Sequence, residues 1–233
     1  SAMHGLEFLR MEATRVGKVD GNPFREALDA IGSELPPADA LVFVPSEFGA
    51  WDHVAFGRVG PAYDECVEVA SQVFFHCYDE SLDWLHLPID APKAVNFYQA
   101  SRAATYAALA EQPAIRPGGL LVVEAGCEES IGQGAGERAC AEAMSRGREA
   151  LLAELDGERD VRVRGGQQRA YVLARALDFC DVALVGADPI DELDEMGIYQ
   201  FDDVDEAIST LEPGERGERL LHPMHRIPVL REI

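Results

Sequence analysis

The sequence predicts an α/β protein with three layers and a mostly parallel central sheet. Short apolar runs of strand length alternate along the chain with longer segments of helical composition. The apolar runs carry hydrophobic residues at consecutive positions, which is typical of strands covered by helices on both faces. A chain of 233 residues that is 47% hydrophobic can build a sizeable core. These features together favour a Rossmann-like domain.

The first half of the chain supplies two predicted strands and one helix. Residues 40–45 (ALVFVP) and 71–78 (SQVFFHCY) are apolar runs of strand length. Residues 94–112 have the composition and apolar spacing of a helix, and their alanines allow close packing against neighbours.

The second half continues the alternation. The predicted elements are a turn and buried strand at 117–126 (PGGLLVVEAG), helices at 136–155 and 167–179, a strand at 181–187, an acid-capped helix at 203–211 and a strand at 226–233. We expect residues 41–45, 120–125 and 181–186 to be neighbours in one buried sheet.

The stretch SELPPADA, residues 33–40, is the best candidate for a boundary within the chain. We therefore expect residues 1–36 to form an amino-terminal arm that packs on a domain formed by residues 37–233. Neither a linker rich in glycine and serine nor an internal repeat divides the sequence further.

The formal charge of −22 restricts the possible partners. Acidic residues outnumber basic ones two to one, so nucleic acids and anionic membranes would be repelled. An anionic small molecule would need a local site rich in arginine. The sequence has no apolar run long enough to span a bilayer and no secretory signal, and we expect a cytoplasmic protein.

The cysteines and histidines do not form a recognisable metal or disulfide pattern. Cys66, Cys77, Cys127, Cys140 and Cys180 are odd in number and form no CxxC, which favours reduced thiols. His222 and His225 are three residues apart, but Pro223 disturbs helical geometry between them. His76 and Cys77 would point to opposite faces of a strand. We expect no metal site in this chain, and find no Ser-His-Asp set or P-loop.

A glycine-rich loop follows the predicted strand at 117–126. Gly132, Gly134 and Gly136 have the spacing GxGxG, whereas a dinucleotide fingerprint requires GxGxxG at the start of a helix. Glu137 would also crowd a pyrophosphate. The loop is either a possible cofactor pocket or a plain connection between strand and helix.

The segment NFYQASR contains the strongest candidate for a binding site. Gln99 and Arg102 are three residues apart, which places an amide and a guanidinium on one helical face. Arginine can bind a carboxylate through two parallel hydrogen bonds. The alternative is an arginine that extends from an ordinary amphipathic helix, with Gln99 solvated beside it.

Four blocks in order resemble the carboxy-terminal domain of the nickel-dependent lactate racemase family. They are GNPFREALDAIG (21–32), PKAVNFYQASRA (92–103), RPGGLLVVEAGCEESIG (116–132) and MGIYQFDDVDEAI (196–208). The most specific piece is P-x-x-x-N-x-Y-Q-A at residues 92–100, followed by the cation Arg102. The resemblance extends over residues 16–229.

The resemblance implies a Rossmann-like domain that forms one wall of an inter-domain active site. In the family the other wall carries a nickel-pincer nucleotide on a lysine, with histidines for metal binding and acid-base chemistry. The reaction removes a hydride from the α-carbon of a 2-hydroxy acid and returns it on either face. By position, Gln99 and Arg102 would hold substrate and cofactor, with Asn96 and Tyr98 from the same segment.

This chain also departs from the family. Ala94 replaces an acid, Gln167-Gln168 replaces a Trp-Gln pair that helps to line the pocket, and Arg102 replaces a lysine. Nothing in the chain matches the amino-terminal domain, so we expect no catalytic residue and no bound cofactor in this chain alone.

Three functions therefore remain open. In the first, the chain is a subunit of a split 2-hydroxy acid racemase or epimerase. It would then act as an isomerase only in a complex with a separate amino-terminal-domain protein, and that protein would hold the nickel-pincer nucleotide. Alternatively, the chain is a non-catalytic ligand-binding or regulatory module, or a dinucleotide-dependent enzyme that uses the loop at Gly132–Gly136.

Overall fold

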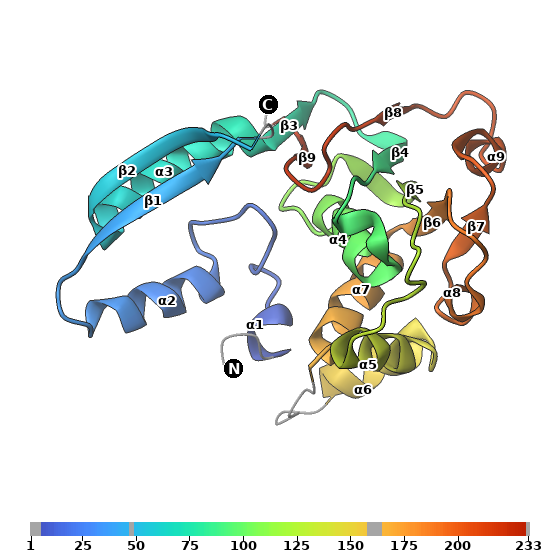
Figure 1. The fold of residues 1–233 in the computed structure, drawn as a ribbon, viewed down its shortest axis with the longest axis horizontal. Helices are drawn as coiled ribbons and strands as arrows, with labels where there is room; N and C mark the ends of the chain where they lie inside the picture. Colours follow the sequence, from blue (N-terminus) through green and yellow to red (C-terminus); the bar gives the residue numbers. More distant parts are fainter. Residues whose placement is uncertain (1–5, 47–48, 158–164, 232–233) are drawn as a thin grey trace.

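A five-stranded, all-parallel sheet forms the centre of the protein (Figure 1). The computed structural model describes residues 6–46, 49–157 and 165–231. The strand order is β7-β6-β5-β4-β8. The strands are β4 (Leu82–Pro88), β5 (Ile115–Glu124), β6 (Asp181–Val185), β7 (Tyr199–Phe201) and β8 (Gly217–Arg219).

Helices cover both faces of this sheet, which confirms the predicted three-layer, Rossmann-like α/β class. One face packs against α4 (Phe97–Ala108) and α7 (Gln167–Phe179), and α5 (Ala135–Met144) and α6 (Arg148–Gly157) pack in turn on α7. The other face packs against α9 (Val204–Ser209), and α8 (Asp191–Glu195) precedes β7 at the sheet edge.

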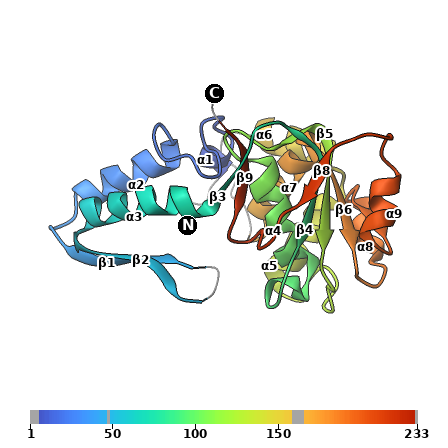
Figure 2. The same ribbon diagram turned by 90° about the horizontal axis from the view of Figure 1, so that it is seen from above.

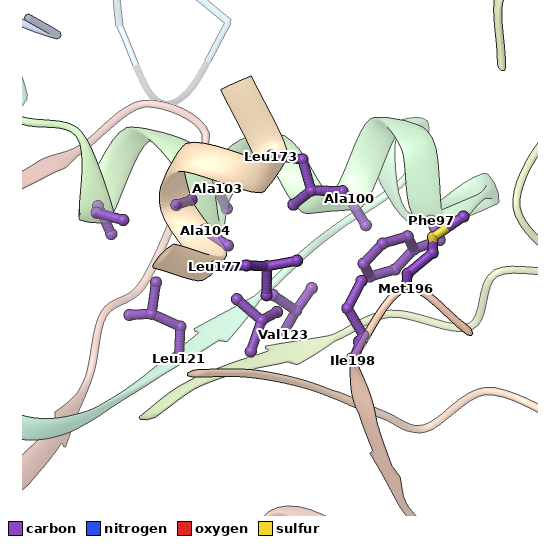
Figure 3. Packing of buried hydrophobic residues seen from close by; sticks show 14 of the residues in the cluster. Phe97, Ala100, Ala103, Ala104, Leu121, Val123, Leu173, Leu177, Met196 and Ile198 are labelled. Carbon is purple, nitrogen blue, oxygen red and sulfur yellow. The ribbon is translucent and has the colours of Figure 1, made fainter. Parts of the chain in front are cut away.

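Strand β5 shows why the sheet is buried on both sides. Its side chains alternate between the two faces: Leu121 and Val123 join the core under α4 and α7, and Leu120 and Val122 join the core under α9. Figure 3 shows Leu121 and Val123 beneath Leu177 of α7 and the alanines of α4. Because those alanines are small, α4 lies close to the sheet.

The amino-terminal residues form a separate unit beside the sheet domain (Figures 1 and 2). Its elements are α2 (Pro23–Ser33), β1 (Asp39–Pro45), β2 (Trp51–Arg58) and α3 (Val59–Phe74). Helix α1 (Leu6–Leu9) contacts both parts, since Phe8 packs on Phe24 of α2 and Leu6 joins the core of the sheet domain. Strands β1 and β2 form an antiparallel ribbon whose inner face packs on α3 through Val44, Ala55, Ala62 and Cys66. Strand β3 (Phe75–Tyr78) then pairs in parallel with β9 (Ile227–Leu230).

The predicted place of residues 41–45 in the buried sheet is wrong, whereas the pairing of β5 with β6 is confirmed. Strand β1 pairs only with β2, and its outer face carries the exposed side chains Leu41 and Phe43. A strand with apolar residues on both faces has the same composition whether it is buried on both sides or on one. The sequence therefore could not separate these two cases.

Two other predicted elements have different bounds. The strand predicted at 71–78 begins only at Phe75, because residues 71–74 are the last turn of α3. The helix predicted at 136–155 is two helices, since Gly147 has a φ of +85° and ends the first one. Residues 232 and 233 of the last predicted strand lie outside the described residues. Within the described residues, no helix is long and apolar enough to cross a membrane.

Candidate functional site

The strand order of the sheet reverses at β4. From β4 the chain adds β5, β6 and β7 on one side and then crosses to place β8 on the other side. Ligands of open parallel α/β sheets bind beyond the carboxyl ends of the strands at such a switch point. A cleft of about 540 Å³ lies there. It is lined by residues 88 and 90–93 after β4, residues 222–225 after β8, and Arg102 and Tyr106 of α4.

Asn96 fixes the start of α4 at the edge of this cleft. Its side-chain oxygen accepts a hydrogen bond from the Gln99 N–H at 3.0 Å, and its amide nitrogen donates to Glu129 at 3.4 Å. The N–H groups of Phe97 and Tyr98 donate to the carbonyls of residues 130 and 131. The first N–H groups of the helix are thus satisfied within the protein. That Asn96 contacts a ligand stays a prediction. For such a contact, Asn96 would have to give up one of these two side-chain hydrogen bonds.

Gln99 is oriented by a lysine that the sequence did not single out as a site residue. The Lys93 ammonium donates to the amide oxygen of Gln99 at 3.4 Å. The amide nitrogen of Gln99 therefore remains available as a donor. Lys93 lines the cleft, whereas Gln99 is not one of its lining residues and is joined to it through Lys93.

Arg102 lines the cleft directly. Its guanidinium lies 5.8 Å from the ring centre of Tyr98, a distance at which a cation and an aromatic face attract each other. Its buried Nε has no hydrogen-bond partner, and none of the described acids forms an ion pair with it. Tyr98 itself faces a small cavity lined also by Ile131 and Cys140. The predicted Gln99–Arg102 face thus borders a cleft, with a cation that is not neutralised.

The turn after β8 brings His222 and His225 to the same cleft. Asp90 is the carboxylate of the lining, and its backbone oxygen accepts hydrogen bonds from the N–H groups of Lys93 and Ala94. In the part of the chain that the structure describes, no group of three or more His, Cys, Asp or Glu side chains could hold a metal ion. The cleft therefore offers cations and hydrogen-bond donors, which suit an anionic ligand.

The glycine loop is closed by a residue of its own helix. The Glu137 carboxylate accepts a hydrogen bond from the Gly134 N–H at 2.7 Å, at the start of α5. Gly136 touches the backbone of Gly166, whose N–H donates to the side-chain oxygen of Gln168 at 3.1 Å. Gly132, Gly134, Gly136, Gln167 and Gln168 therefore lie at the junction of α5 and α7. An anion could bind the loop only by displacing Glu137.

His86 is a buried histidine that pairs with a partly exposed glutamate. It lies in the middle of β4, and its Nε2 is 2.7 Å from the Glu124 carboxylate. Burial lowers the pKa of His86, and the carboxylate of Glu124 opposes this effect only in part. The imidazole is therefore held mainly neutral in the fold, as a structural group.

The five cysteines are all free, and all except Cys77 are buried. Burial raises the pKa of Cys127 to about 12, of Cys140 to about 11 and of Cys180 to about 12. These three thiols are consequently protonated at neutral pH and are poor nucleophiles.

Comparisons with solved structures relate the fold to lactate racemase. The chain superposes on the lactate racemase apoprotein of Thermoanaerobacterium thermosaccharolyticum with a TM-score of 0.80 and 19% identity, over 99% of this chain and 55% of that one. A structural-genomics protein from Thermotoga maritima gives a TM-score of 0.64 and 14% identity, over 98% of this chain and 58% of its own. No family model matches the sequence, and no curated protein matches it. The chain therefore has a lactate-racemase-like fold and spans little more than half the length of the structures it matches.

Proposed function

We propose that this chain forms the substrate-binding wall of a split 2-hydroxy acid racemase or epimerase. One observation carries the proposal: Arg102 lines the cleft at the switch point of the sheet and has no carboxylate partner among the described residues. In a chain of charge −22, a cation without a partner is well suited to an external anion. The lactate-racemase-like fold favours a 2-hydroxy acid as that anion.

The residues of the cleft divide the recognition of such a substrate between them. Arg102 would bind the carboxylate through its planar guanidinium. Gln99, whose amide oxygen is held by Lys93, would donate its amide N–H to the substrate oxygen beside the α-carbon. Two directed contacts on neighbouring oxygen atoms would fix the α-carbon and orient it toward the open side of the cleft.

The described residues of this chain do not fit a nickel site of their own, since they contain no group of three suitable ligands. They do fit one wall of a site for an anionic cofactor, because the cations Lys93 and Arg102 line the cleft. The cleft is also large enough to hold part of a cofactor in addition to a small acid. The nickel-pincer nucleotide of the resemblance would then be held by a partner subunit, where it would supply the hydride chemistry. The part of this chain would be to bind and orient.

The ribbon of β1 and β2 supports the need for a partner. Exposed large apolar side chains concentrate between residues 28 and 63: Leu28, Ile31, Leu35, Leu41, Phe43, Trp51, Val54, Phe56, Val59 and Tyr63. Exposed apolar surfaces of this kind are typical of interaction sites. These side chains come from α2 and the residues after it, from the ribbon and from the start of α3, and not from the segment around Gln99. Pro45 at the end of β1 nevertheless lines an apolar cavity that shares Tyr106 and Met224 with the cleft.

Titration of the purified chain with D- and L-lactate tests the binding step. Arg102→Ala should weaken binding roughly 10- to 100-fold, as expected for a hydrogen bond between charged groups. Arg102→Lys should recover part of the loss. Arg146→Ala is the matched control, because Arg146 pairs with Glu154 far from the cleft.

The other two functions predict different results. If the parent chain binds lactate but never supports turnover with a racemase amino-terminal domain, it is a binding module. If Arg102→Ala binds lactate like the parent, the site lies elsewhere. A dinucleotide enzyme should bind NAD in a manner that depends on the loop at Gly132–Gly136, which Glu137 now closes.

A further inference from the structure

A second arginine lies beside Arg102, and it too has no carboxylate partner among the described residues. Arg169, in the first turn of α7, is partly buried and donates to the Thr105 hydroxyl at 2.8 Å and to the Ser101 hydroxyl at 3.0 Å. Its Nε is buried and has no hydrogen-bond partner. The two hydroxyls belong to α4, on either side of Arg102 in sequence, so Arg169 holds the segment that presents Arg102.

Seven other arginines in the described chain form ion pairs with acids: Arg25, Arg58, Arg116, Arg146, Arg216, Arg219 and Arg231. Among the described residues, the side-chain partners of Arg169 are two neutral hydroxyls. The pKa of Arg169 is lowered to about 10, chiefly by burial and to a smaller extent by the positive charge of Arg102. Arg169 is still charged at neutral pH, and the two arginines repel each other.

The two neighbouring positive charges have a consequence for the ligand. A ligand with one negative charge would balance only one of them. A ligand with two negative charges would balance both, and the attraction would be strong because the surroundings are partly buried. If the side chain at position 169 only held α4 in place, an uncharged hydrogen-bond donor could bind the same two hydroxyls.

We propose that Arg169 is a positioning residue that adds a second positive charge beside Arg102, so that the site prefers 2-hydroxy acids carrying a second negative charge to monocarboxylates. Arg102 contacts the ligand, and Arg169 acts through it and through the Ser101 and Thr105 hydroxyls. The inference rests on the proposed function and narrows its substrate class to 2-hydroxy dicarboxylates such as malate.

Competing titrations of the full chain with L-malate and L-lactate, at matched ionic strength, measure this preference. The parent should bind malate at least about tenfold more tightly than lactate. Arg169→Gln should reduce that ratio to near one, and Arg169→Lys should keep most of it. Arg175→Gln is the matched control: Arg175 lies on the same helix, is also partly buried and donates to the Tyr171 hydroxyl, away from α4. It removes the same charge and should leave the ratio unchanged.

The ratio of malate affinity to lactate affinity distinguishes an effect of the Arg169 charge from the support that Arg169 gives to α4. If Arg169→Gln weakens malate and lactate equally, Arg169 only supports α4 and the proposal is wrong. A parent chain with no preference for malate also overturns it, even if Arg169→Gln does not fold. Loss of lactate binding in Arg102→Ala together with an unchanged ratio in Arg169→Gln would leave the proposed function intact and remove only this inference.

Discussion

The contact between Gly136 and Gly166 gives a sharp test of how α5 and α7 are held together. A Cβ atom on Gly166 would overlap the carbonyl oxygen of Gly136 and lie 2.8 Å from its carbonyl carbon. Gly166 also has a φ of +98°, which L side chains rarely adopt. Its carbonyl accepts hydrogen bonds from the N–H groups of Arg169 and Ala170, so the first turn of α7 depends on it.

Gly166→Ala should therefore lower the free energy of unfolding by about 2–6 kcal/mol. The left-handed backbone contributes about 1–3 kcal/mol, and the forced separation of two backbones adds about 1–3 kcal/mol. For a chain of this size, the expected fall in melting temperature is about 4–24 °C. Gly165→Ala is the matched control, since a Cβ there would have no heavy atom within 4 Å. Equal melting temperatures for the two variants would refute the close contact.

Two further predictions concern the sheet. Val122→Lys should abolish soluble expression, because an unpaired buried charge costs several kcal/mol. Leu41→Lys on the exposed face of the ribbon should be tolerated, and soluble yield and melting temperature compare the two variants. For His86, the folded-state pKa is lower than the unfolded one, so its contribution to stability is complete above about pH 6.5 and is lost as the pH falls through the folded pKa. Chemical unfolding between pH 8 and 5 should show a weaker pH dependence in His86→Gln than in the parent, and equal slopes would contradict this.

The sequence predicted those parts of the fold that depend on local pattern. Strands β5 and β6 are continuous apolar runs, and such runs are buried on both faces wherever they pair. Strand β4 was not assigned, because Asp83 and His86 interrupt its apolar pattern; in the structure these side chains bond to Arg116 and Glu124. Strand β2 and helix α3 were not assigned either, and Gly60 and Pro61 at the start of α3 look like a turn in the sequence.

The candidate site was likewise predictable only where it depends on local sequence. The spacing of Gln99 and Arg102 was enough to place them together, since both lie within one helix. Lys93 lies only six residues before Gln99 and was within reach of the same local reasoning. His222 and Arg169 could not be joined to this segment from the sequence. Their approach depends on the crossing that brings β8 beside β4 and on the packing of α7 against α4, both of which are long-range features.

The acids around the site explain why its cations remain without partners in so acidic a chain. Glu129 accepts a hydrogen bond from Asn96, Glu137 accepts one from the Gly134 N–H, and Glu124 pairs with His86. Each of these three carboxylates is thus held by a local donor. By binding the acids elsewhere, the fold keeps two positive charges together, and an anion that enters from outside is the group that can balance them.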